Sequence, residues 1–462
     1  MTKDPWNLLL STHRYGGRND SRNHLDARSE FDRDHDRIVF SSAFRRLKDK
    51  TQVFPLSKND FTRTRLTHSI EVSCVGRSLG TSLETILEGR GVNSEITRSI
   101  PTIVAAACLA HDIGNPPFGH SGEDAIQAWA KQNVALKQSE LGKARFCVDS
   151  DAKMLDLHNF EGNAQGLRIL CRLQARSRVG GLQLTHATLG AMLKYPCDSQ
   201  VKGRSDNDVA CKKFGFFQSE KSKIVSALSK LGMVPDGDAF RRHPLAFLVE
   251  AADDICNTIV DLEDSIDQQV VSYEDAIGVL EPLVAAGGTD VKASVYKGDS
   301  RLRWLQASSI SSLSKACEAV VKENLDLMLD GTMKQSLIDQ SNVKSHYDKI
   351  RDLVQKHAYP NQRVLKVELA GFKVIGGLLD IFAPALLNDS PNKADEKILG
   401  LFPRSHLYIL DGQDFENENR RELLDHLTNY ERLLAITDYI SGMTDSFAVE
   451  LFQELSGIQL PA

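Results

Sequence analysis

Residues 108–125 read CLAHDIGNPPFGHSGEDA, an apolar run that ends in an adjacent His and Asp. Two prolines then restrict the backbone, and the flanking glycines allow a tight turn before His120. His120 and Glu123 follow at i, i+3, so both side chains share one helix face. Packing alone gives no reason for a buried helix to end this way. The stretch predicts a rigid turn between a metal-binding pair and an acid–base pair.

The pair His111-Asp112 needs further ligands if it holds a metal, because neighbouring residues on a helix point about 100° apart. His68 and Asp253 are the candidates on either side. Two imidazoles and two carboxylates suit an octahedral divalent ion, and they favour manganese, iron or cobalt over magnesium. With no Cys in the set, a structural zinc is disfavoured. Taken alone, the His-Asp pair fits a helix-capping His and a turn Asp equally well. The sequel up to Glu123 favours the metal site.

The composition of the 462 residues is that of a globular protein, with 41% hydrophobic and 26% charged residues. A net charge of −6 gives no general attraction to nucleic acid, so any polyanion site must be local. Eight scattered cysteines without a CxxC pair indicate reduced thiols. The first residues lack a signal-peptide pattern, and the apolar run 103–110 is too short to span a bilayer. We expect a soluble, cytoplasmic protein with no membrane segment.

Apolar spacing predicts a mainly α (all-α) fold. The expected helices cover 66–90, a segment opening at Ser99–Pro101, 160–175, 220–232, 244–266, 310–330 and 421–455. Residues 363–369 (RVLKVEL) fit a short strand or a helix start. Polar stretches at 131–157 and 198–213 interrupt the helices, and 287–289 marks a boundary. We predict a basic arm with a substrate loop (1–60), a catalytic core (61–275) and a carboxyl-terminal helical region (276–462).

The order His68, His111-Asp112, Asp253 resembles the H…HD…D signature of the HD phosphohydrolase superfamily. The wider pattern is similar to the bacterial deoxyguanosine triphosphate triphosphohydrolase (dGTPase) family from about residue 5 to the carboxyl terminus. Seven motifs in family order carry this resemblance: FRRLKDKTQVF (44–54), RTRLTHSIEV (63–72), AHDIGNPPFGHSGE (110–123), NFEGNAQGLRIL (159–170), LKYP (193–196), EAADDI…DLED (250–264) and DYISGMTD (438–445). The resemblance implies an all-helical HD core.

The resemblance also implies a reaction, in which water attacks the α-phosphorus of a deoxynucleoside triphosphate (dNTP) and releases a deoxynucleoside and inorganic triphosphate. One divalent ion, Mn most readily and Mg, Fe, Co or Ni as alternatives, would be held at each active site. The implied roles are as follows: metal ligands His68, His111, Asp112 and Asp253; proton transfer by His120 and Glu123; α-phosphate neutralisation by Arg65; outer phosphates and sugar at Lys194 and Tyr195; a substrate contact at Asn163; and the 3′-hydroxyl at Gln52 and Asp261.

These roles agree with elementary chemistry. The α-phosphate is anionic, so attack on it is slow until a cation and a guanidinium withdraw charge. Arginine offers two parallel donors to phosphate oxygens, which lysine cannot. Asp253 and Asp261 are eight residues apart, about two helical turns, so they can face one cleft. We expect the 3′-hydroxyl to donate to Asp261 and to accept from the amide of Gln52.

Other candidates have plainer interpretations. Asp254 is expected to point away from the cleft, and His158, His186 and His243 are expected to be structural. The amino-terminal arm alternates basic and acidic side chains, which indicates a salt-bridged surface, with contact to single-stranded DNA as the alternative. Its charged residues are Arg14, Arg18, Arg22, Arg28, Arg33 and Arg37, with Asp20, Asp26, Asp32, Asp34 and Asp36.

Three positions depart from the family pattern: Asn257 replaces a common Tyr, Cys197 a frequent Arg, and Ser446 a frequent basic residue. Strict dGTP preference is therefore left open, and a broader dNTPase or one that needs a dNTP or single-stranded DNA effector is the alternative. An HD phosphohydrolase acting on other nucleotides and a regulatory DNA-binding relative are the competing functions. The family resemblance also suggests a homo-oligomer, a hexamer.

Overall fold

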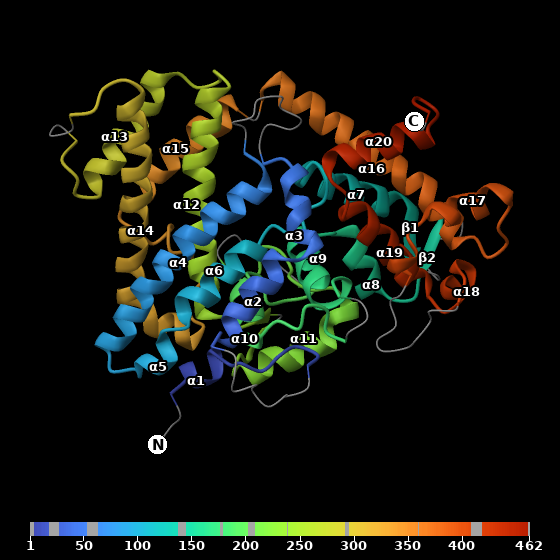
Figure 1. Cartoon of the computed structure of the whole chain (residues 1–462), viewed down its shortest axis with the longest axis horizontal. Helices are drawn as coiled ribbons and strands as arrows, with labels where there is room; N and C mark the ends of the chain where they lie inside the picture. Colours follow the sequence, from blue (N-terminus) through green and yellow to red (C-terminus); the bar gives the residue numbers. More distant parts are fainter. Residues whose placement is uncertain are drawn as a thin grey trace.

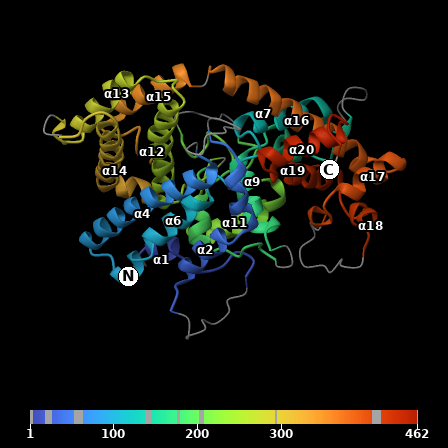
Figure 2. The same ribbon diagram turned by 45° about the horizontal axis from the view of Figure 1, so that its top comes forward.

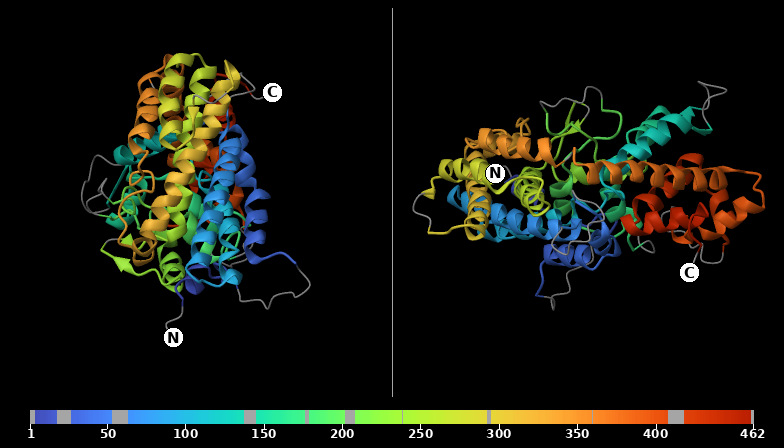
Figure 3. Two further views of the ribbon diagram at one scale, coloured as in Figure 1. Left: turned by 90° about the vertical axis from the view of Figure 1, so that its left-hand side faces the viewer. Right: turned by 90° about the horizontal axis from the view of Figure 1, so that it is seen from above.

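The computed structural model describes residues 4–17, 27–52, 63–136, 145–175, 179–201, 208–237, 239–291, 295–358, 360–407 and 418–460. Helices dominate this part of the chain, which confirms the predicted mainly α fold. The molecule is elongated, and the two ends of the chain lie far apart along it (Figures 1 and 3).

The chain up to the end of α12, somewhat more than half of its length, forms a helical core around α4, α6, α10 and α12. Its helices are α1 (Trp6–Leu9), α2 (Glu30–Val39), α3 (Ser42–Arg46), α4 (Arg65–Gly89), α5 (Ser94–Thr97), α6 (Ile100–Ala110), α7 (His120–Asn133), α8 (Asp151–His158), α9 (Gly162–Arg168), α10 (His186–Met192), α11 (Gln218–Lys230) and α12 (Pro244–Asp267). A 3₁₀ turn covers Leu47–Asp49, and a π turn, Ile169–Leu173, extends α9.

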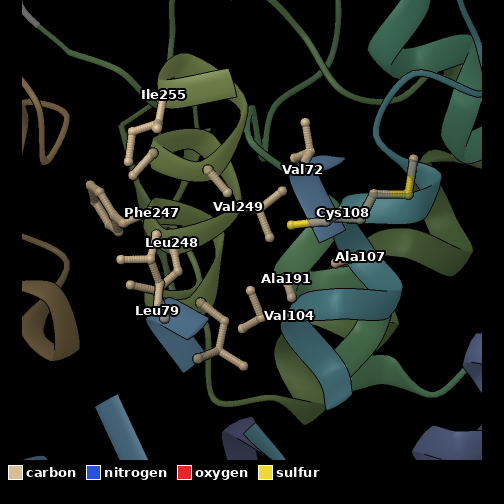
Figure 4. Close-up of a cluster of buried hydrophobic side chains, with 14 of the residues drawn as sticks. Val72, Leu79, Val104, Ala107, Cys108, Ala191, Phe247, Leu248, Val249 and Ile255 are labelled. Carbon is tan, nitrogen blue, oxygen red and sulfur yellow. The ribbon is translucent and has the colours of Figure 1, made fainter. Parts of the chain in front are cut away.

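The closest helix contact in this core joins α4 to α6. A Cβ at Gly76 would collide with the Cys108 sulfur, and one at Gly80 would lie 2.8 Å from Pro101 Cα. These glycines, one turn apart, therefore let α4 approach α6 closely. The apolar faces of α4, α6, α10 and α12 meet in the cluster drawn in Figure 4, where Val72, Cys108 and Val249 are labelled. This packing fixes the helices that carry the predicted metal ligands.

The remaining helices pack on both ends of the core. They are α13 (Tyr273–Ala286), α14 (Asp299–Asp330), α15 (Lys344–His357), α16 (Gln362–Leu387), α17 (Lys393–Leu401), α18 (Arg420–Asp425), α19 (Asn429–Ser441) and α20 (Asp445–Leu455), with a 3₁₀ turn at Arg404–His406. α13 to α15 stand beside α12 and α4, whereas α16 to α20 lie toward the opposite end (Figures 1 and 2). A second hydrophobic cluster joins α7 and α8 to α16 and α19.

Helix α16 settles the ambiguous segment 363–369 as the start of a helix rather than a strand. Asn361 caps it by accepting from the Arg363 amide at 2.9 Å. α16 is also the one described helix long and apolar enough to cross a membrane, but half of its apolar window is buried inside the protein. Burial against α7 and α19 accounts for that apolar character.

Strands are few among the described residues. Val134–Leu136 (β1) pairs in parallel with Phe146–Val148 (β2), and Pro235–Asp236 (β3) pairs antiparallel with Ala239–Phe240 (β4). β1 and β2 lie in the polar interruption predicted at 131–157, and α13 ends just before the boundary predicted at 287–289. The division of the chain at residues 60 and 275 stays a prediction.

Candidate active site

One cavity of about 820 Å³ brings the predicted site residues together. The ends of α6 and α10, the start of α4 and α7, and the face of α12 supply its wall. The predicted residues that line it are Gln52, Arg65, His111, Asp112, His120, Asn163, Lys194, Tyr195, Asp253 and Asp261. His68 and Glu123 are buried directly behind, in contact with Asp253 and His120 respectively.

The predicted metal ligands form a tight cluster. Donor atoms of His68, His111 and Asp112 all lie within 4.8 Å of one another. Asp253 Oδ1 is 3.3 Å from His68 Nε2 and 3.2 Å from His111 Nε2, and His111 Nε2 is 3.6 Å from Asp112 Oδ1. Ligands bound at about 2.1 Å in an octahedron stand about 3 Å apart, so these separations fit donors around one ion.

The tautomer of His111 supports the same conclusion. Its Nδ1 donates to the Cys108 carbonyl at 2.6 Å, which leaves the Nε2 lone pair facing Asp253. This Nε2 is buried and has no hydrogen-bond partner among the described residues. A buried nitrogen lone pair without a donor is costly unless something binds it. The donor set therefore fits a divalent metal ion.

Two cations flank the carboxylates of this cluster. Arg65 Nη1 donates to Asp112 Oδ2 at 2.7 Å, and Lys194 Nζ to Asp253 Oδ2 at 2.5 Å. Burial by itself would raise the pKa of Asp112, but the positive charge of Arg65 lowers that pKa below its ordinary value. Burial would likewise raise the pKa of Asp253, but nearby positive charge, above all that of Lys194, lowers this pKa below its ordinary value. Both carboxylates are thus held ionised, as metal ligands need to be.

His120 and Glu123 form the expected pair on the first turn of α7. His120 Nδ1 and Glu123 Oε2 are 2.9 Å apart, and the Gly162 amide donates to Glu123 Oε1 at 2.7 Å. The hydrogen bond to Glu123 is the largest influence on His120 and raises the pKa of its ring. The side chain of Glu123 is buried, whereas that of His120 is 79% exposed. The ring is therefore oriented from behind and open toward the cavity.

The turn that precedes His120 requires a glycine at position 119. Gly119 has φ +59°, and a Cβ there would lie 2.6 Å from the Arg65 guanidinium. Only glycine combines that conformation with the close approach of Arg65. Phe118, the residue before it, also has a positive φ, 63°.

The sequence did not single out Lys213 and Glu161, which also line the cavity. Lys213 Nζ is 3.0 Å from Glu161 Oε1 and 4.0 Å from Glu123 Oε2. Asn163 Nδ2 donates to Glu161 Oε1 at 2.8 Å. Lys213 lies in the interruption predicted at 198–213, where it has no helical periodicity to mark it. Glu161 stood inside a quoted motif and could have been included on that ground.

Gln52 and Asp261 line the cavity, and each has one buried oxygen without a hydrogen-bond partner among the described residues: Gln52 Oε1 and Asp261 Oδ1. Gln52 Nε2 donates to Asn257 Oδ1, and Asn257 Nδ2 donates to Asp253 Oδ1, both at 2.8 Å. Burial, with the charges of Asp264 and Asp253, raises the pKa of Asp261 to about 8. Asn257, one of the departures from the family pattern, thus anchors Gln52 to a metal-ligand candidate.

Helix α15 forms part of the cavity wall, which no local pattern in the sequence predicted. Tyr347, Arg351, Val354 and Gln355 contribute, followed by residues from the start of α16. Asp254 lines the cavity too, so the expectation that it points away is wrong. Because α15 packs on α12, the wall of the cavity includes Asp254 as well as Asp253.

The remaining histidines and the amino-terminal arm behave as expected where they are described. His158 Nε2 contacts the Val134 carbonyl at 2.9 Å and His243 Nε2 the Leu9 carbonyl at 3.0 Å, away from the cavity. His186 is buried beside His13. In the arm, Arg14 pairs with Glu30 and Asp34, Arg28 with Asp36, and Arg33 with Glu30. Arg18, Arg22, Asp20 and Asp26 lie outside the described residues.

The other two departures from the family pattern face away from the cavity. The buried Cys197 thiol donates to the Lys213 carbonyl at 3.2 Å, and Ser446 Oγ donates to Asp49 Oδ1 at 2.9 Å. All eight cysteines are free thiols, as predicted.

Comparison with known proteins matches residues 65–192 to the HD domain family and residues 387–454 to the phosphohydrolase-associated domain. The first span includes three of the four clustered metal-ligand candidates, and the second ends near the carboxyl terminus. A deoxyguanosinetriphosphate triphosphohydrolase-like protein of Synechocystis sp. is 38% identical over 98% of this chain and 100% of its own length. The chain belongs to the deoxyguanosinetriphosphate triphosphohydrolase-like family.

Two further relatives show a similarity of nearly the same extent. A relative with the same name from Pseudomonas aeruginosa is 37% identical over 99% of this chain and all of its own length. A deoxyguanosinetriphosphate triphosphohydrolase from Enterobacter sp. is 31% identical over 93% of this chain and 94% of its own. The protein is therefore a hydrolase with an HD domain, and it belongs to the nucleotide phosphohydrolases. The resemblance on which the sequence interpretation rested is confirmed.

Proposed function

We propose that the protein hydrolyses deoxynucleoside triphosphates, dGTP among them, to the deoxynucleoside and inorganic triphosphate in a metal-dependent reaction. The observation that carries this proposal is the convergence, in one cavity, of a metal-donor cluster, a His–Glu pair and several cations. A triphosphate makes use of all three, whereas a smaller nucleotide offers these cations fewer phosphate oxygens to bind.

His68, His111, Asp112 and Asp253 would hold one divalent ion. When bound, the ion supplies Lewis-acid polarisation of the α-phosphate and lowers the pKa of water. Mixed imidazole and carboxylate donors favour Mn²⁺, with Fe²⁺ or Co²⁺ next and Mg²⁺ or Ni²⁺ as further candidates.

The cations in the cavity would bind the phosphate chain. Arg65 is 6% exposed and already oriented by Asp112, so its guanidinium neutralises charge at the α-phosphate without losing much side-chain freedom. Lys194 and Tyr195 follow from the end of α10 and would contact the outer phosphates and sugar. Asn163 and Lys213, joined through Glu161, extend this polar wall.

His120 would either take a proton from the attacking water or give a proton to the leaving 5′-oxygen. Glu123 accepts from His120 Nδ1–H, which fixes the tautomer and leaves Nε2 for the reacting group. The leaving alkoxide is a strong base, so a ring that stays protonated to higher pH assists its departure.

Gln52 and Asp261 would recognise the 3′-hydroxyl. Asn257 accepts from one N–H of the Gln52 amide, and Gln52 Oε1 has no partner among the described residues, so this oxygen would accept from the hydroxyl. A protonated Asp261 donates to that same hydroxyl. This hydrogen-bond direction is the opposite of the one expected from the sequence.

Assembly and location complete the proposal. Exposed apolar side chains recur along α16 at Leu365, Leu369 and Phe372, spaced i, i+4, i+7 on one helix face. Such a face supports the proposed homo-oligomer, a hexamer by family resemblance. We also propose a cytoplasmic location and a dNTP or single-stranded DNA effector.

The test is a panel of the four dNTPs with Mn²⁺, Mg²⁺ and Co²⁺, with products separated by anion exchange. Inorganic triphosphate and deoxynucleoside in equal amounts are expected, and His120→Ala should lower kcat by about 10²–10⁴ while metal and nucleotide still bind. Release of pyrophosphate and monophosphate, or activity only on monophosphates, would exclude the proposed reaction.

A further inference from the structure

The motif DYISGMTD, residues 438–445, has no part in the chemistry proposed above. None of its residues lines the cavity within the described chain, yet Asp438 and Asp445 are each 1% exposed. Two buried carboxylates need partners that compensate their charge and hydrogen-bonding capacity. Their partners are the loops that form the active site.

Asp445 holds two of these loops with one carboxylate. Its Oδ2 accepts from the Thr51 amide at 3.0 Å and from Thr51 Oγ1 at 2.6 Å. Its Oδ1 accepts from the Phe118 amide at 3.0 Å. Thr51 immediately precedes Gln52, and Phe118 lies two residues before His120.

The hydrogen bond to Asp445 is made by a residue, Phe118, with an unfavourable backbone conformation. Phe118 has φ 63°, a conformation that a side-chain-bearing residue keeps only when its surroundings hold it. Gly119 continues the turn with φ +59° and becomes the residue before α7. The direction in which α7 presents His120 therefore depends on the bond between Phe118 and Asp445.

The end of α19 makes further contacts with the same two loops. Lys50 Nζ donates to the carbonyls of Ser441 at 2.8 Å and Asn115 at 2.5 Å. Arg46 Nη1 donates to the Gly442 carbonyl at 2.7 Å. One short segment is therefore bonded to the residues before Gln52, Arg46 to Thr51, and to the turn before His120 at once.

Asp438 reaches a third element of the site. It accepts from Gln165 Nε2 at 2.9 Å and from Arg168 Nε at 2.8 Å, both on α9. α9 also carries Asn163 and the Gly162 amide that donates to Glu123. The motif thus contacts three elements of the site: the residues before Gln52, the turn before His120 and α9.

We propose that Asp445 is a positioning residue that couples recognition of the sugar at Gln52 to proton transfer at His120. The inference rests on the proposed function for the roles of Gln52 and His120. The carboxylate accepts from both loops, and an amide in its place has only one oxygen. In Asp445→Asn, one loop must lose its acceptor and the other loop shifts with it.

The test compares Asp445→Asn with Thr51→Val and with Ser446→Ala as the matched control. Ser446 adjoins Asp445 but bonds Asp49 at the surface. Measurements are kcat and KM for dGTP and for 3′-deoxy dGTP (dideoxy-GTP), melting temperature, and amide hydrogen exchange of the segments containing Thr51 and Phe118.

Asp445→Asn should lower kcat for dGTP by about tenfold or more and narrow the dGTP to dideoxy-GTP ratio by about the same factor. Hydrogen exchange should accelerate in both segments together. Thr51→Val keeps the hydrogen bond from Phe118 to Asp445. It should narrow the dGTP to dideoxy-GTP ratio but lower kcat less than Asp445→Asn does. Ser446→Ala should match wild type in all measurements.

A merely structural role for Asp445 would lower the melting temperature and the active fraction while the ratio of the two substrates stays at its wild-type value. That result overturns the proposal, as does faster exchange in only one of the two segments. Absence of dNTP hydrolysis by wild type would instead overturn the proposed function. The exchange measurement would then still decide whether Asp445 joins the loops.

Discussion

Replacing Gln52 by alanine tests how the cavity distinguishes sugars. In the structure, Gln52 and Asp261 line the cavity, and their buried oxygens Gln52 Oε1 and Asp261 Oδ1 lack hydrogen-bond partners among the described residues. In the proposed binding mode, a 3′-hydroxyl would satisfy both atoms, whereas a 3′-deoxy sugar would satisfy neither. Each buried group left unpaired costs about 1–3 kcal/mol, a factor of about 5 to 150 in kcat/KM. Gln52→Ala removes one of the two atoms, so the wild-type preference for dGTP over dideoxy-GTP should narrow by that factor.

The assay is parallel kinetics of dGTP, dideoxy-GTP and GTP on wild type and Gln52→Ala. Asn257→Leu serves as a second variant, because it keeps Gln52 but removes its anchor at 2.8 Å. This variant should narrow the dGTP to dideoxy-GTP ratio less than Gln52→Ala does. We expect neither variant to hydrolyse GTP well, because the role proposed for Gln52 is at the 3′-hydroxyl and not at the 2′ position. A wild-type ratio of dGTP to dideoxy-GTP in Gln52→Ala would refute the role given to Gln52.

Three further predictions concern proton transfer, the metal and the fold. Glu123 raises the pKa of His120, so Glu123→Gln should move the alkaline limb of the kcat/KM profile to lower pH; an unmoved limb would contradict the pairing. His111→Ala should lose bound divalent metal in elemental analysis while circular dichroism stays helical, and full occupancy would remove His111 from the ligand set. A Cβ at Gly114 would collide with the backbone of α9, so Gly114→Ala should lower the unfolding free energy by about 1–3 kcal/mol in urea titration. Gly278→Ala, where a Cβ meets nothing within 4 Å, should instead stabilise by about 0.5–1 kcal/mol, and equal effects at both positions would contradict the collision.

The sequence was sufficient for the parts of the site that local patterns control. His111-Asp112 ends an apolar helix, and the eight-residue spacing of Asp253 and Asp261 places both on one face of α12, as the cavity shows. The Pro-Pro turn and the i, i+3 spacing of His120 and Glu123 correspond to a hydrogen-bonded pair at the start of α7. Helical periodicity was informative because these positions lie within one or two turns of each other.

Contacts between segments that are distant in the chain could not be predicted from local spacing. The wall formed by α15, which brought Asp254 into the cavity, depends on how α13 to α15 pack on α12. The amide nitrogen of Gln52 donates to Asn257, which is 205 residues away in the chain. Lys213 reaches Glu161 from an irregular segment that carries no periodic signal. Tertiary packing determines each of these, and no local spacing encodes it.

The central claim is that water attacks the α-phosphorus, and oxygen-18 labelling tests it most directly. Wild-type protein with Mn²⁺ hydrolyses dGTP in H₂¹⁸O, and mass spectrometry locates the label. Cleavage between the α-phosphorus and the 5′-oxygen predicts one ¹⁸O atom in inorganic triphosphate and none in deoxyguanosine. Label in the 5′-hydroxyl of deoxyguanosine, or in a pyrophosphate or monophosphate product, would contradict the account.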